Sequence, residues 1–135
     1  MVHSGRLTRV RAAALAGAVL ATVGLVAACG GGTAASAPPP PSGVVAVEAN
    51  EYKFTPSTLT VGAGKVTFYV RNAGTVEHEF ELFKGDQVVD EVEGLVPGLA
   101  KNLTVTLEPG EYTFMCKLSG HDQLGMKGTL TVTGN

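Results

Sequence analysis

Three potential metal ligands lie close together near the C-terminal end of this 135-residue chain. Cys116, His121 and Met126 fall within eleven residues, and four residues separate each of them from the next. This spacing allows a thiolate, an imidazole and a thioether to meet at one point. One further histidine, His78, lies 38 residues before Cys116. We predict that these four side chains form a single metal site.

The four side chains are the ligand set of a mononuclear blue-copper centre: two imidazoles, one thiolate and one weakly bound axial thioether. Zinc is the main alternative metal, because two histidines and a cysteine also suit it. A thioether is a poor zinc ligand, and copper leads the Irving–Williams order, so the set favours one copper ion. Since no base lies beside a nucleophile and Met126 closes the coordination sphere, we expect no enzyme activity.

Each ligand also has an ordinary structural explanation when it is considered alone. A core-facing histidine is commonly a hydrogen-bonded structural residue, a buried cysteine often acts as a small hydrophobe, and a methionine fills gaps. Those explanations do not account for the shared spacing of Cys116, His121 and Met126, or for His78 as the only other histidine after the leader. The metal site explains all four together.

Strand periodicity tests the ligand assignment independently. Alternate side chains face opposite sides of a strand, so His78 shares a face with Phe80 and Leu82, and Cys116 shares one with Phe114. Both proposed ligands therefore belong to apolar faces. An inward-pointing histidine is costly unless its nitrogens find partners, and a metal would be a partner for one of them.

Short apolar segments separated by glycine and proline predict an all-β domain with no helical period. The candidate strands are 44–49, 58–61, 66–72, 77–83, 87–92, 101–107, 111–116 and 127–133. About eight short strands in this length indicate a β-sandwich.

The order of the ligands is similar to that of the cupredoxin family. An Asn-x-Gly segment at Asn72 leads to His78, a strand ends in Cys116, and His121 and Met126 follow on one loop. The resemblance implies a Greek-key β-sandwich with the first histidine on one strand and the other ligands around the closing loop. The Cys-x4-His-x4-Met spacing resembles that of rusticyanin-like members.

A second resemblance covers roughly residues 44–132. The segment from Val92 to Tyr112 is similar to the cupredoxin-like domain of EfeO-type iron-uptake lipoproteins. The chain departs from that pattern because no helical peptidase-like domain follows and because its copper ligand set is complete. The resemblance implies a second possible role, as the metal-binding component of an iron or copper uptake system.

Three glutamates alternate with the face that carries His78. We expect Glu77, Glu79 and Glu81 to form a solvated edge of the domain. The EfeO resemblance implies that they act as a secondary metal site or as a face for a partner.

The first 28 residues have the features of a bacterial lipoprotein signal peptide. Three arginines precede an uncharged apolar run over residues 12–28, small residues end the run, and Cys29 follows. Cys29 would then be lipidated and hold the protein on the outer face of the cell membrane, or in the periplasm. An uncleaved membrane anchor is the alternative, because 17 residues are close to the lower limit for a membrane span.

Residues 29–43 are rich in glycine and proline and predict a partly stiff linker, which leaves 44–135 as one small domain. Without the three leader arginines, seven basic residues face twelve acidic ones, a formal charge of −5 that argues against nucleic-acid binding. With Cys29 lipidated, Cys116 has no disulfide partner within its own chain. We expect a monomer whose partner is a redox protein or a metal-uptake membrane protein.

Overall fold

The structure is a computed structural model that describes residues 38–134. The predicted signal peptide, Cys29 and the first part of the linker lie outside the described residues. Within residues 38–134, no helix has both the length and the apolar character needed to cross a membrane.

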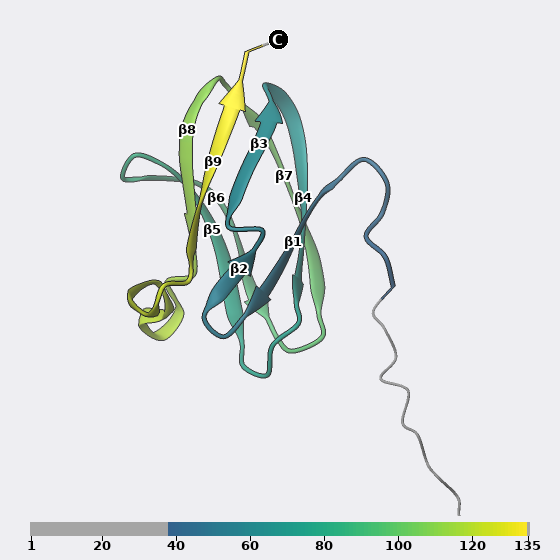
Figure 1. The fold of residues 1–135 in the computed structure, drawn as a ribbon, viewed down its shortest axis with the longest axis vertical. Coiled ribbons are helices and arrows are strands. Elements are labelled where there is room, and N and C mark those ends of the chain that lie inside the picture. Colours follow the sequence, from purple (N-terminus) through teal and green to yellow (C-terminus); the bar gives the residue numbers. More distant parts are fainter. Residues whose placement is uncertain (1–37, 135) are drawn as a thin grey trace, which may run out of the picture. The chain divides into compact units, whose positions relative to one another are not determined.

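Nine strands form two sheets that pack face to face (Figure 1). One sheet has the order β2-β1-β4-β7 and the other the order β3-β9-β8-β5-β6. The strands are β1 (Val45–Asn50), β2 (Lys53–Thr55), β3 (Thr58–Gly62), β4 (Gly64–Asn72), β5 (His78–Lys84), β6 (Gln87–Leu95), β7 (Ala100–Leu107), β8 (Gly110–Met115) and β9 (Lys127–Thr133). A short 3-10 helix, η1 (Leu118–Leu124), lies between β8 and β9.

The predicted β-sandwich is confirmed, and each of the eight expected strands has a counterpart. The additional strand is β2, which pairs antiparallel with β1. It was missed because three residues are too few to give a readable alternation, and Pro56 follows the last of them directly.

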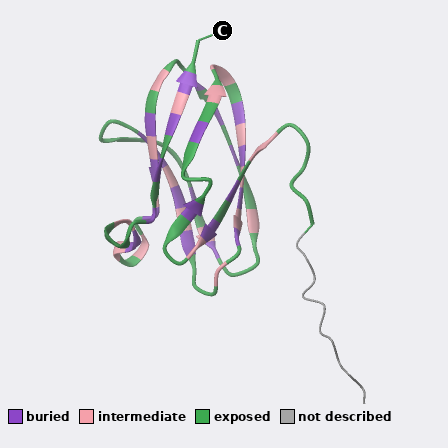
Figure 2. Cartoon of the chain, viewed as in Figure 1, coloured by how far each residue is buried: buried purple, intermediate pink, exposed green. Residues whose placement is uncertain are grey.

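Four phenylalanines fill the space between the two sheets. Phe54 contacts Phe80 and Phe114 edge to face, Phe80 stacks on Phe114, and Phe68 contacts Phe80 from the opposite sheet. All four are at most 2% exposed, and full burial of such a side chain contributes about 1.5–3 kcal/mol. Figure 2 shows buried residues alternating with exposed ones along the strands, which is the pattern expected for a two-layer core.

Asn72, at the end of β4, fixes the loop that leads to His78. Its side chain is fully buried and donates to the carbonyl oxygens of Val76 (2.7 Å) and Leu95 (2.6 Å). Its own Oδ1 accepts a hydrogen bond from the Gly74 N–H at 2.8 Å. Because Leu95 pairs with His78 across β5 and β6, this amide connects the loop to both strands beside His78.

Asn72→Ala would leave two carbonyl oxygens and one N–H without their partner. We expect the free energy of unfolding to fall by about 2–4 kcal/mol, since each buried polar group left unpaired costs about 1–3 kcal/mol. Urea denaturation measures the change, and Asn102→Ala, at an exposed position of β7, is the matched control. Equal losses in the two variants would contradict this role for Asn72.

Candidate metal centre

Pairing of two strands brings the first two predicted ligands together. His78 is the first residue of β5, and Cys116 directly follows the last residue of β8. The two strands are antiparallel neighbours with Glu81 opposite Met115, so the start of β5 and the end of β8 lie at the same end of the sheet. His121 lies in η1, which begins two residues after Cys116.

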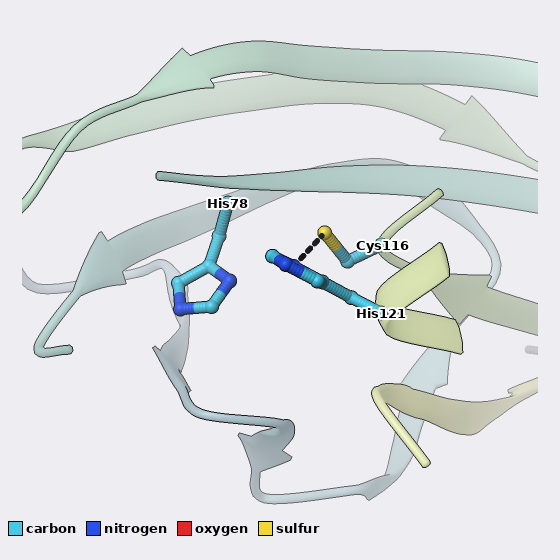
Figure 3. Close-up of side chains that lie close together, drawn as sticks. All are labelled: His78, Cys116 and His121. Carbon is cyan, nitrogen blue, oxygen red and sulfur yellow. Dashed lines mark hydrogen bonds between the residues drawn. The ribbon is translucent and has the colours of Figure 1, made fainter. Parts of the chain in front are cut away.

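The metal-binding atoms of His78, Cys116 and His121 all lie within 4.8 Å of one another. Cys116 Sγ is 3.4 Å from His121 Nδ1, and the centroids of the two imidazole rings are 5.2 Å apart. All three residues are buried. Figure 3 shows the three side chains converging from β5, from the end of β8 and from η1.

His78 is fully buried, yet neither of its ring nitrogens has a hydrogen-bond partner among residues 38–134. Buried polar atoms normally have partners, so two such atoms on one side chain require an explanation. Burial lowers the pKa of His78, and the neighbouring His121 ring adds to this effect. The ring is therefore neutral near pH 7, which is the form that binds a metal.

Cys116 is a free, buried cysteine. Burial raises the pKa of its thiol, while a hydrogen bond of 3.3 Å from the Glu79 N–H to Sγ acts in the opposite direction. Metal binding would release the thiol proton, because the thiolate is the ligand. The Glu79 amide would remain as a donor to the sulfur.

Met126 is fully buried and is connected to the other loop residues through the backbone. The Cys116 N–H donates to the Met126 carbonyl oxygen, and the Met126 N–H donates to the His121 carbonyl oxygen, both at 3.1 Å. Gly125, with φ of 106°, makes the turn that this closed loop requires. These bonds place Met126 in the same loop as two predicted ligands, and its role as the axial ligand stays a prediction.

Two further residues border the site. The Tyr52 ring lies 4.7 Å from the His121 ring, and Glu51 Oε1 lies 3.6 Å from His78 Nε2. Hydrogen bonds from the backbone of Thr75 and Val76 lower the pKa of Glu51 to about 2. Neither residue was predicted, because they lie in the turn between β1 and β2 and contact the site only through the tertiary fold.

The predicted glutamate face needs one correction. Glu77 is exposed, but Glu79 and Glu81 are only half-exposed, because β5 is an interior strand between β8 and β6 and not an edge. Partial burial raises the pKa of Glu79 and of Glu81, and neighbouring glutamates add to the effect. In the described part of the chain, the group of three or more side chains that could hold a metal is His78, Cys116 and His121, so the three glutamates do not form such a group.

The residues present fit a metal that prefers nitrogen and sulfur. The site offers a neutral imidazole with unpaired nitrogens, a second imidazole and a thiol, all within reach of one ion. Soft thiolates and imidazoles together select copper or zinc over magnesium and calcium, which prefer oxygen ligands.

Known proteins resemble the chain in sequence and in structure. A family model for the cupredoxin-like domain matches residues 17–132. The iron uptake system component EfeO of Yersinia pestis is 42% identical over 89 residues, which is 66% of this chain and 23% of EfeO. The chain therefore spans less than a quarter of the length of that relative.

Two solved structures share the fold. Dithionite-reduced auracyanin from Roseiflexus castenholzii has a TM-score of 0.63 at 22% identity, over 70% of this chain and 99% of auracyanin. Auracyanin A from Chloroflexus aurantiacus, described as a "blue" copper protein, has a TM-score of 0.57 at 23% identity, over 67% of this chain and 100% of its own.

The predicted resemblances to cupredoxins and to the EfeO domain are thereby confirmed. The family model covers well over half of the sequence, and the two-sheet fold agrees with it. The chain belongs to the cupredoxin-like domain family.

Proposed function

We propose that this chain is an exported, membrane-tethered copper protein that transfers electrons through one mononuclear site. The observation that carries the proposal is the convergence of His78, Cys116 and His121, all buried, with their metal-binding atoms within 4.8 Å. Met126 completes the ligand set, and Cys29 supplies the lipid anchor. Bound copper would supply a one-electron couple between its monovalent and divalent states.

The side chains divide the work of such a centre. The two imidazoles hold the ion, and the Cys116 sulfur, which accepts the Glu79 N–H, provides the coupling to a redox partner. The closed backbone of the 116–126 loop keeps the ligands in place when the charge of the ion changes. The role is that of a carrier, not of a catalyst.

A second candidate is a metal-binding component of an iron or copper uptake system. The 42% identity to EfeO over 89 residues favours it. In that case the partner is a metal-uptake membrane protein, and the half-buried glutamates of β5 take part in docking to it.

The two candidates differ in how they hold copper through a redox cycle. We expect the copper content to stay at one ion per chain when the protein is reduced and reoxidised without oxygen in the presence of a chelator, because a carrier must keep its ion in both states. Metal analysis after desalting at each stage measures this. Loss of the ion in either state would instead support the uptake role.

Copper(II) added to the metal-free protein should produce an intense visible absorption, because a short bond to the Cys116 thiolate gives a sulfur-to-copper charge-transfer band. Cys116→Ser should abolish the band. Cys29→Ser is the matched control, since it removes the other cysteine of the chain and should leave the spectrum unchanged. A colourless complex of the unmodified protein would rule out the blue-copper centre.

Met126→Leu should retain copper and raise the reduction potential. An axial thioether is a weak ligand, and replacing it with an apolar side chain disfavours the more highly charged oxidised ion. Voltammetry of Met126→Leu and of Met115→Leu makes the comparison, because Met115 lies on the other face of β8 and is half-exposed. An unchanged potential in Met126→Leu would show that Met126 is not a ligand.

A further inference from the structure

Glu51 reaches from the turn between β1 and β2 to the outer side of His78. Its Oε1 atom lies 3.6 Å from His78 Nε2, just beyond hydrogen-bond length. The Glu51 side chain is 30% exposed, whereas the His78 side chain is fully buried. The carboxylate therefore lies between the buried ring and the surface.

The loop before His78 holds this carboxylate in place. Oε1 accepts hydrogen bonds from the Thr75 N–H at 2.6 Å and the Val76 N–H at 3.0 Å. The Thr75 hydroxyl is a further donor at 3.4 Å. The position of the carboxylate is thus set by the backbone and does not depend on His78.

The same loop is shaped to leave room for Glu51. A Cβ atom at Gly74 would overlap the Glu51 carboxylate, so a side chain at this position would displace it. Asn72 in turn fixes Gly74 and Val76 through its buried amide. A fully buried residue of β4 thereby determines where the Glu51 oxygen lies.

The two nitrogens of His78 face different surroundings. Figure 3 shows one ring nitrogen directed toward Cys116 and His121 and the other directed away. Since Nε2 is the atom near Glu51, the nitrogen facing the site is Nδ1. A proton on Nε2 would leave the Nδ1 lone pair free on the side of Cys116.

We propose that Glu51 is a positioning residue that accepts the Nε2–H of His78 and so directs the Nδ1 lone pair into the metal site. Closing the contact to a normal hydrogen bond requires a shift of about half an ångström. Carboxylates that hold the far nitrogen of a metal-binding histidine fix its tautomer and ring orientation. That the lone pair binds copper depends on the proposed function, whereas the tautomer does not.

The competing explanation is that Glu51 only caps the 74–76 loop. Both explanations expect Glu51→Ala to lower stability, so stability does not separate them. The position of the proton on His78 does, because a loop cap has no effect on it.

Long-range nitrogen–proton NMR of the metal-free full chain at neutral pH reports that position. We expect His78 to carry its proton on Nε2, and we expect Glu51→Ala to produce a mixture of tautomers. Glu51→Gln should restore the Nε2–H form, because the amide oxygen accepts the same bonds. Glu48→Ala is the control, since Glu48 is an exposed carboxylate of β1 that pairs with Arg71.

Gly74→Ala provides a second test that changes no charge. It should displace the carboxylate and give the same mixture of tautomers as Glu51→Ala. In both variants copper(II) affinity should fall about ten- to hundred-fold, the usual effect of losing such a partner, while Glu48→Ala should leave it unchanged.

The tautomer and the affinity fail separately. A single Nε2–H tautomer in wild type, Glu51→Ala and Gly74→Ala would overturn the positioning role, even if copper binds. A change of tautomer in a chain that binds no copper would support the positioning role and overturn the copper function alone.

Discussion

Burial of His78 without hydrogen bonds is the constraint on which the rest of the structure depends. A buried polar group without a partner costs about 1–3 kcal/mol, and this ring has two such nitrogens. The sandwich tolerates the cost because four packed phenylalanines and the paired strands stabilise the domain around it. A metal ion on one nitrogen and a carboxylate on the other would remove the cost.

The surroundings of His78 indicate a site formed before any metal arrives. β5 and β8 bring His78 and Cys116 to one end of a sheet, and hydrogen bonds within the 116–126 loop hold His121 and Met126 there. Asn72 fixes the preceding loop from the opposite sheet. Since the ligands come from paired strands and a closed loop, the protein has little need to rearrange when an ion binds.

Much of this arrangement was predictable from local sequence. The alternation of a strand is regular, so His78 could be assigned to the face of Phe80 and Leu82, and both are fully buried. The even spacing of Cys116, His121 and Met126 indicated a single ligand loop, and its backbone bonds agree with that.

The remaining features depend on strand order and on distant contacts. Glu79 and Glu81 were expected at an edge, but strand order is not readable from one strand, and β5 lies inside its sheet. Glu51 and Tyr52 reach the site only because β1 and β4 pair in parallel and bring their ends together. No periodicity or spacing relates Glu51 to Thr75 and Val76.

X-ray absorption at the copper edge of the loaded full-length protein tests the central claim most directly. The account predicts one copper per chain with one short sulfur contact and two imidazole nitrogens, and loss of the short sulfur contact in Cys116→Ser. A copper surrounded only by nitrogen and oxygen in the unmodified protein would contradict it.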